Sequence, residues 1–308
     1  MNMNMRLVFV LVLNLLVLMA EAQQRRRKPR IQQAPSAAPS DTVKTAAPPE
    51  PAMDPATARL DSMRRNDSLV MASGYDPLSV RKVHVSDVMY KMQVWRIIDL
   101  REKCNQPFFA SGNEITKAIC DAVYSGKLDA YAKDSLSKLL TVAEFKEKLM
   151  DPASAQTDAD GNPIPGSGTP FMPRQLYVLQ FRENLLFDKQ RSRFYYDIQT
   201  ITLYVPAELS VKGTLSEVAS FRYNDLVRIF KSMPNARWYN GQNRAEDKKI
   251  SDAMDLRLFC SRILKISNPK DQMIEDLPEY SGNPRAILAA SQKYEYELVA
   301  KENEVWDY

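Results

Sequence analysis

The distribution of aromatic residues limits which part of this sequence can form a folded core. No aromatic residue occurs from Val10 to Gly74 and no glycine precedes Gly74, whereas seven of the 19 prolines lie between Pro29 and Pro55. A segment of this composition buries too little apolar area to offset the entropy that it would lose on folding, and its prolines favour extended conformations. We therefore predict a disordered Pro/Ala-rich tether over residues 23–75.

The first 22 residues have the pattern of a secretory signal peptide. Arg6 precedes an apolar run from Leu7 to Ala20, and the sequence Ala-Glu-Ala that ends at Ala22 has the small residues of a cleavage site. The run spans about 14 residues, fewer than the ~20 that a transmembrane helix needs. We therefore predict a cleaved signal peptide over residues 1–22, with a membrane anchor as the alternative.

The charge of the remaining chain argues against nucleic acid as a partner. The net charge is +4, but nine Lys/Arg and six Asp/Glu fall in residues 23–80, which leaves residues 81–308 with a net charge of +1. Proteins that bind nucleic acid need a basic surface to neutralise phosphates. A nearly neutral folded part does not provide one.

The sequence contains no motif for cofactor or metal chemistry. It has one histidine, His84, and it lacks a Cys-x-x-Cys pair, a Gly-rich phosphate loop and a Gly-x-Ser-x-Gly element. We predict no catalytic residue, no cofactor and no metal. The three cysteines, Cys104, Cys120 and Cys260, are too few for a disulfide scaffold, and we predict buried free thiols, with a Cys104–Cys120 pair left open.

Local signals divide the folded part into segments. Capping-box spacings at Ser111–Glu114 and Thr141–Glu144 predict helices within residues 76–150, and composition predicts a loop over residues 151–173. Two runs rich in aromatic and β-branched residues, RQLYVLQFRENLLF and RFYYDIQTITLYV, then predict an antiparallel hairpin with a bulge at Thr200.

Helices are predicted to follow this hairpin over 224–232, over 251–265 and from Asn283-Pro284 towards the C-terminus. The C-terminal part, residues 174–308, is thus α+β, and whether it forms one compact domain with residues 76–150 is left open. The predicted fold class is α+β, mostly helical, with an antiparallel hairpin or a small sheet.

The stretch from Val88 to Asn105 fits a helix with two apolar sides. At 100° per residue, one side carries Tyr90, Val94, Ile97, Leu100 and Cys104. The opposite side carries Val88, Met92, Trp95 and Ile98 among charged residues. Such a helix must be covered twice, either by its own chain or by a partner whose surface meets Trp95. Catalysis by Asp99 and Glu102 is disfavoured, because neighbouring cations would keep both carboxylates ionised.

Four stretches, in this order along the chain, resemble a known family. They are WRIIDLREKCNQPFF, LLFDKQRSRFYYDIQTI, YNGQNRAEDKKISDAMDLRLF and ENEVWDY. They are similar to segments of the GldN/PorN family, the gliding-motility and type IX secretion ring proteins of the Bacteroidetes. The resemblance covers about residues 80–308. Cys104 departs from it, since an ordinary apolar residue is expected there.

The resemblance implies a non-enzymatic structural subunit in the periplasm. It implies assembly with an outer-membrane lipoprotein of the PorK/GldK type and with further copies into a ring, beside the subunits of an inner-membrane motor. The protein would then be held peripherally at the outer membrane. Our candidate interface residues are Met92, Trp95, Ile98, Asp99, Arg101 and Glu102. The alternatives are a periplasmic hydrolase or lyase that uses carboxylates, and a peptide- or glycan-binding module that uses the aromatic residues near Tyr177–Tyr204.

Overall fold

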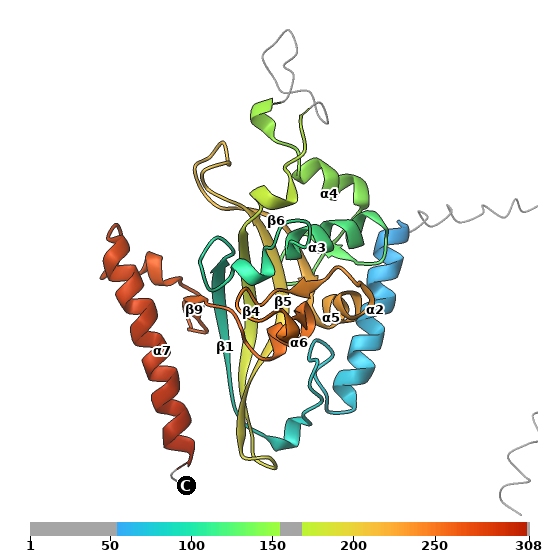
Figure 1. Cartoon of the computed structure of the whole chain (residues 1–308). Coiled ribbons are helices and arrows are strands. Elements are labelled where there is room, and N and C mark those ends of the chain that lie inside the picture. The colour runs from blue at the N-terminus through green and yellow to red at the C-terminus, as the bar shows by residue number, and fades with distance from the viewer. Residues whose placement is uncertain (1–53, 155–167, 307–308) are drawn as a thin grey trace, which may run out of the picture. The chain divides into compact units, whose positions relative to one another are not determined.

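A seven-stranded antiparallel sheet forms the centre of the structure, with the strands in the order β3-β2-β6-β5-β4-β1-β9 (Figure 1). The computed structural model describes residues 54–154 and 168–306, which belong to one compact unit, Met53–Tyr308. The predicted signal peptide, and the predicted tether up to residue 53, lie outside the described residues.

The strands of the large sheet are β1 (Val88–Asp99), β2 (Ala130–Tyr131), β3 (Leu139–Leu140), β4 (Val178–Asp188), β5 (Arg193–Val205), β6 (Ser216–Arg222) and β9 (Arg262–Ile266). A second sheet pairs β7 (Arg237–Trp238) with β8 (Lys248–Lys249). The α-helices are α2 (Pro55–Ala72), α3 (Ile115–Tyr124), α4 (Val142–Lys148), α5 (Tyr223–Ser232), α6 (Ile250–Asp255) and α7 (Pro284–Trp306). Short 3-10 turns occupy Val85–Asp87, Gln106–Phe108, Pro152–Ser154, Pro173–Gln175, Arg244–Glu246 and Ile274–Asp276.

The sheet corrects the predicted fold class, which was mostly helical with a hairpin or a small sheet. The predicted hairpin is present as β4 and β5, and its register shifts between Arg182 and Glu183, opposite Thr200, as the bulge prediction required. The hairpin is, however, the middle of a seven-stranded sheet. The largest error is β1, because a twelve-residue strand lies where a helix was predicted.

The alternation of β1 was hidden because both faces of this strand carry apolar side chains. Trp95 and Ile97 point to one face, and Val94 and Ile98 point to the other. On the second face the alternation is also interrupted by a charged residue, Arg96. The helix predicted over 251–265 is confirmed for residues 251–255 and wrong for the rest, since α6 ends at Asp255 and β9 begins at Arg262.

Helix α2 lies within the predicted tether, so that prediction is wrong for residues 55–72. Asp54 accepts a hydrogen bond at the start of the helix, and Pro55 occupies its first position. Leu60 is its one buried hydrophobic residue. Ion pairs attach it instead, and the strongest joins Asp67 to Arg222 of β6 at 2.7 Å.

Of the three predicted helix caps, two are confirmed and one is not. Thr141 and Glu144 form the predicted capping box of α4, and Asn283 accepts hydrogen bonds from the first turn of α7. Ser111 does not cap α3. Glu114 takes the N-cap position without a side-chain hydrogen bond to the helix.

The two faces of the sheet differ in chemistry. The first, which we call the apolar face, packs against α3, α5 and α6 in the main core and against α7 in a second cluster. Figure 1 shows α7 beside β9 at one edge of the sheet. The second, which we call the polar face, contacts α2 through a small cluster that includes Leu60 and Tyr131. Its buried central residues are polar, namely Gln180, Asn184, Asp197, Thr200, Thr202 and Ser220.

No helix suited by length and hydropathy to span a bilayer is found among residues 54–154 and 168–306.

Candidate functional site

Strand β1 and the turn after it carry the residues that the sequence proposes as an interface. They are Met92, Trp95, Ile98, Asp99, Arg101 and Glu102. A helix would place Met92, Trp95 and Ile98 side by side, but a strand sends alternate side chains to opposite faces. Met92 and Ile98 therefore lie on the apolar face, and Trp95 lies on the polar face.

The two residues on the apolar face are covered by the chain itself. Ile98 is 2% exposed and lies in the main core, so it cannot contact a partner and the interface prediction is wrong at this position. Met92 is half-buried against the cluster that α7 completes. The accessible part of the candidate interface is thus Trp95 together with the charged residues at the end of β1.

The charged residues at the end of β1 form ion pairs. Arg101 donates to Asp99 over 2.9 Å, and it lies 3.5 Å from Glu208. Its guanidinium carbon lies 3.7 Å from the centre of the Tyr177 ring. The hydrogen bonds to Asp99 raise the pKa of Arg101. These residues form an exposed charged cluster, in which the carboxylates of Asp99 and Glu208 both lie near the guanidinium of Arg101.

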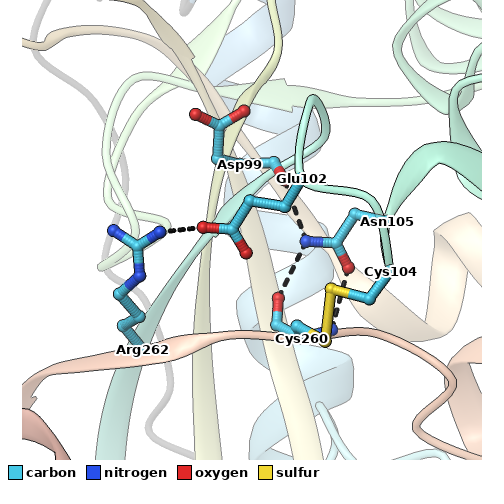
Figure 2. The surroundings of a disulfide bond; sticks show 6 residues. All are labelled: Asp99, Glu102, Cys104, Asn105, Cys260 and Arg262. Carbon is cyan, nitrogen blue, oxygen red and sulfur yellow. Dashed lines mark hydrogen bonds and ion pairs between the residues drawn. A yellow bond between two sulfur atoms is a disulfide. The ribbon is translucent and has the colours of Figure 1, made fainter.

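Asn105 ties the turn after β1 to the segment that leads into β9. It is 0% exposed, and its Nδ2 donates to the backbone oxygens of Asp99 at 2.8 Å and Cys260 at 2.9 Å. Its Oδ1 accepts from the backbone N–H of Cys260 at 2.8 Å. Figure 2 shows this amide between the two segments.

A disulfide and an ion pair reinforce the same junction (Figure 2). Cys104 and Cys260 form the disulfide, with their Cα atoms 6.0 Å apart, and Glu102 pairs with Arg262 of β9. The prediction of three free thiols is therefore wrong for two of them, and the alternative pair with Cys120 is also wrong. Cys120 is free and buried, and burial raises the pKa of its thiol to about 12.

A buried charge network lies on the apolar face, between β1, β4 and α7. Glu183 is 0% exposed and accepts from both Arg96 and Arg257, the latter at 2.7 Å. Arg96, 3% exposed, also donates to Glu295 of α7. Although burial acts to lower the pKa of Arg96, the charge of Glu183 and the bonds to both glutamates raise it overall. The network thus fixes α7 to the sheet through paired buried charges.

No expectation from the sequence included this network, although the sequence contains a signal for it. Arg96 and Glu183 each occupy an inward position in a strand whose other inward residues are apolar. A charge in such a position is buried, and buried charges are paired. In the folded protein, Arg257 reaches this network from a backbone position with a φ of 53°, which is uncommon for a residue other than glycine.

On the polar face, register aligns Lys265, Trp95 and Arg182 across three neighbouring strands. The indole Nε1 of Trp95 donates to Asp134 at 3.0 Å, and the ammonium of Lys265 lies 3.9 Å from the ring centre. The chain therefore already satisfies the indole N–H and covers part of the ring. On a helix, the Trp95 side would have needed cover from its own chain or from a partner. On the strand, residues of the same chain already provide part of that cover.

A cavity of about 200 Å³ opens beside Trp95 on this face. Its polar walls come from four strands and the turn between β2 and β3, and they include Asp134, Gln180, Tyr204 and Glu217. Burial raises the pKa of Glu217, and the charge of Asp134 adds to this effect.

Asp197 is the most strongly shifted carboxylate of the polar face. It is 3% exposed and accepts from Gln199 at 2.6 Å, and burial raises its pKa to about 6. The folded protein therefore holds this proton more tightly than the unfolded chain. Its contribution to stability is present below about pH 4 and is lost as the pH rises through 6.

We expect Asp197→Asn to raise the free energy of unfolding by about 1–3 kcal/mol at pH 8, because the neutral amide removes a buried charge and can still accept from Gln199. Denaturant unfolding between pH 4 and 8 measures this. The difference between variant and parent should shrink towards zero as the pH falls to 4. An equal difference at all pH values would show that the carboxylate does not titrate in this range.

The carboxylates suggested for catalysis are engaged in ion pairs in the described part of the chain. No group of three or more His, Cys, Asp or Glu side chains that could hold a metal is found in the described part of the chain. Asp99 and Glu102, the carboxylates considered for catalysis, each pair with an arginine.

Comparison with known protein families finds a match. The model of the family described as "Gliding motility associated protein GldN" matches residues 83–307, from the turn before β1 to beyond the end of α7. No curated protein matches the chain.

Proposed function

The chain belongs to the GldN family of gliding motility associated proteins, and from this we propose that it is a structural subunit of the type IX secretion and gliding machinery. It assembles into a periplasmic ring by binding an outer-membrane lipoprotein and further copies of itself. The observation that carries the proposal is the length of the family match, which spans β1 to α7 and so includes all seven strands of the central sheet.

The junction at the end of β1 supports a location outside the cytoplasm. Disulfides persist in oxidising compartments such as the bacterial periplasm and are rare in the cytosol. The Cys104–Cys260 bond and the signal peptide predicted over residues 1–22 therefore favour the same compartment. Attachment at the outer membrane through the lipoprotein partner is part of the proposal, as is an approach to the inner-membrane motor.

The accessible part of β1 is the surface that we propose for the lipoprotein. Arg101, in the turn after β1, has a side chain that is 50% exposed, and Trp95 lies on the polar face of β1, beside the cavity. Tryptophan and arginine are the residues most enriched among those that dominate binding energy in protein interfaces. Ion pairs restrain the side chains of Arg101 and Glu102 before a partner binds, which reduces the entropy lost on binding.

The size and composition of the native complex test the proposal. A tagged chain extracted gently from the cell envelope should run as a particle far larger than its own 35.1 kDa, and it should carry an outer-membrane lipoprotein identified by mass spectrometry. A species of monomer size without a membrane-associated companion would contradict the proposal and favour a small periplasmic enzyme or binding module.

We expect Trp95→Ala to reduce the recovered lipoprotein by at least about fivefold, since truncation of an interface tryptophan costs about 1 kcal/mol or more. Quantitative mass spectrometry of the purified complex measures this. Trp95→Phe retains an aromatic ring and should retain most of the binding.

A second variant separates loss of binding from loss of fold. Arg101→Ala changes a half-exposed side chain and should leave thermal unfolding unchanged while it lowers the recovered lipoprotein. If both Trp95→Ala and Arg101→Ala recover as much lipoprotein as the parent chain, this surface does not bind it.

A further inference from the structure

Exposed apolar side chains gather at the end of the molecule where β1 begins. They come from the end of α2, from the segment that follows it and from the first residues of β1, and they are Met71, Tyr75, Val85 and Met89. Val85, at 67%, is the most exposed of the four and Tyr75, at 38%, is the least. Apolar surface of this kind, surrounded by polar residues, marks a contact with a partner or a membrane.

Backbone contacts hold these segments together in one surface. The N–H of Val85 donates to the backbone oxygen of Gly74 at 2.8 Å, and an isolated β-bridge pairs Tyr75 with His84. Met71, Tyr75 and Val85 line a single cavity of about 220 Å³. The turn between β4 and β5 lies beside the start of β1 (Figure 1), so it belongs to the same end of the molecule.

This end presents its cations to the solvent and keeps its carboxylates further inside. Residues 69–91 and 186–197 contain six Lys/Arg and four Asp, a net charge of +2. Asp188 and Asp197 are 0% and 3% exposed, and Asp76 and Asp87 are half-buried. The six cations are all exposed, namely Arg81, Lys82, Lys91, Lys189, Arg191 and Arg193. The accessible charge of this surface is therefore mainly positive.

The chain itself neutralises only part of this charge. Lys91 pairs with Asp76 at 3.8 Å, and Arg191 pairs with Asp188 at 2.7 Å. From α7, Glu304 acts on Tyr90 through its charge, but it is itself paired with Lys301 at 2.6 Å. The other four cations form no ion pair within residues 54–154 and 168–306, and they are Arg81, Lys82, Lys189 and Arg193.

Apolar and positive side chains alternate closely on this surface. Arg81 and Lys91 line the same cavity as Tyr75 and Val85, and the guanidinium carbon of Arg81 lies 4.7 Å from the centre of the Tyr195 ring. A surface that combines exposed apolar groups with cations binds a bilayer through two additive effects, the burial of apolar area and the attraction of anionic head groups.

We propose that this end of the chain lies directly on an anionic lipid surface. Its cations meet the lipid phosphates, and Val85 and Met89 enter between the head groups. Tyr75 has the apolar ring and polar tip that suit the boundary between lipid and water. Lysine is depleted in the interfaces between proteins, so three exposed lysines beside these apolar residues favour a lipid over a protein as the partner.

The contact goes beyond the proposed function, in which a lipoprotein attaches the chain to the outer membrane. It rests on that proposal for its location alone. The test uses the purified chain and vesicles without the lipoprotein, so the two proposals can fail separately. Vesicle binding without recovery of a lipoprotein from the envelope would contradict the first, and recovery without vesicle binding would contradict the second.

The test is co-sedimentation of the chain from Gln23 onwards, the predicted secreted form, with two kinds of vesicle. One contains phosphatidylcholine alone, and the other contains equal parts of phosphatidylcholine and phosphatidylglycerol. We expect binding to the charged vesicles to be at least about tenfold tighter, and added salt should weaken it. The basic run Arg25–Arg30 is present in every variant, so differences between variants report on the folded surface.

A matched pair of double variants locates the charge-dependent part. Lys82→Gln with Arg193→Gln removes two of the unpaired cations and should weaken binding to the charged vesicles by about tenfold. Lys127→Gln with Arg285→Gln makes the same change in charge at exposed positions elsewhere and should leave most of the binding. Unchanged thermal unfolding shows that each variant is folded.

A third double variant tests the apolar part. Val85→Ser with Met89→Ser keeps every charge and should weaken binding by about fivefold or more, because less apolar area enters the lipid. This loss should persist at high salt, whereas the effect of the charge variant should shrink.

Three outcomes would overturn the proposal. The first is an equal effect of the two charge variants. The second is a Val85→Ser, Met89→Ser chain that binds vesicles as the parent chain does. The third is a surface variant that lowers the recovered lipoprotein or the size of the native particle while vesicle binding stays unchanged, which would assign this surface to a protein partner.

Discussion

Replacing Glu183 by alanine is expected to lower the free energy of unfolding by about 3–5 kcal/mol, a large part of the 5–15 kcal/mol that stabilises a typical domain. The carboxylate is 0% exposed and binds two arginines. Without it, Arg96 remains buried with Glu295 as its one remaining acidic partner among the described residues. An uncompensated buried charge is costly, because the interior solvates it poorly.

Urea unfolding followed by circular dichroism measures this loss of stability. Two further variants serve as controls. Glu183→Gln keeps the side-chain size and should retain part of the stability, since the amide oxygen can still accept one hydrogen bond. Glu297→Gln removes an exposed partner of Lys293, 3.8 Å away on α7, and should change stability by less than about 0.5 kcal/mol. A Glu183→Ala effect as small as that of Glu297→Gln would show that the network does not hold the fold.

Elements defined by short-range signals were predictable from this sequence. The bulged hairpin of β4 and β5 follows from the alternation of its side chains. The capping box at Thr141 and the Asn-Pro start of α7 follow from the chemistry of helix ends. In each case the residues that determine the structure lie within a few positions of one another, so the sequence contains the whole cause.

Elements that depend on distant partners were not predictable. Helix α2 buries Leu60 alone among its residues, and its ion pair to Arg222 spans 155 positions of the chain. Strand β1 has side chains covered on both faces, and its charged inward residue is matched by Glu183 and Glu295, which lie 87 and 199 positions away. A local pattern cannot reveal such matches, so composition predicted a tether and periodicity predicted a helix.

Part of the candidate interface predicted from the sequence is accessible in the structure, although it lies on a strand and a turn and not on a helix. The sequence identified Trp95, Asp99, Arg101 and Glu102 as accessible polar or aromatic residues, and the strand leaves them partly accessible. Ile98 was added because a helical turn would bring it beside Trp95, and it is buried instead. Asp134 and Glu217, which complete the cavity, come from other strands and turns and left no local signal.

Reduction of the Cys104–Cys260 disulfide is the second large effect that we expect, at about 2–5 kcal/mol of unfolding free energy. The bond joins residues 156 positions apart, so it restricts the unfolded chain strongly. In the folded state it links the turn after β1 to the segment before β9, and β9 is the edge strand against which α7 packs. The loss should therefore appear first as weaker protection of β9 and α7 in hydrogen exchange.

A matched pair of variants distinguishes the disulfide from the cysteines themselves. The parent chain should lose stability when a reductant is added, whereas Cys260→Ser should already be less stable and should not respond to the reductant. Under denaturing, non-reducing conditions, alkylation should modify one thiol of the parent chain, Cys120, and all three after reduction. Because Asn105 bridges the same segments through three hydrogen bonds, the junction should survive reduction as a weaker contact. Three reactive thiols in protein taken directly from the envelope would show that the bond does not form where the protein works.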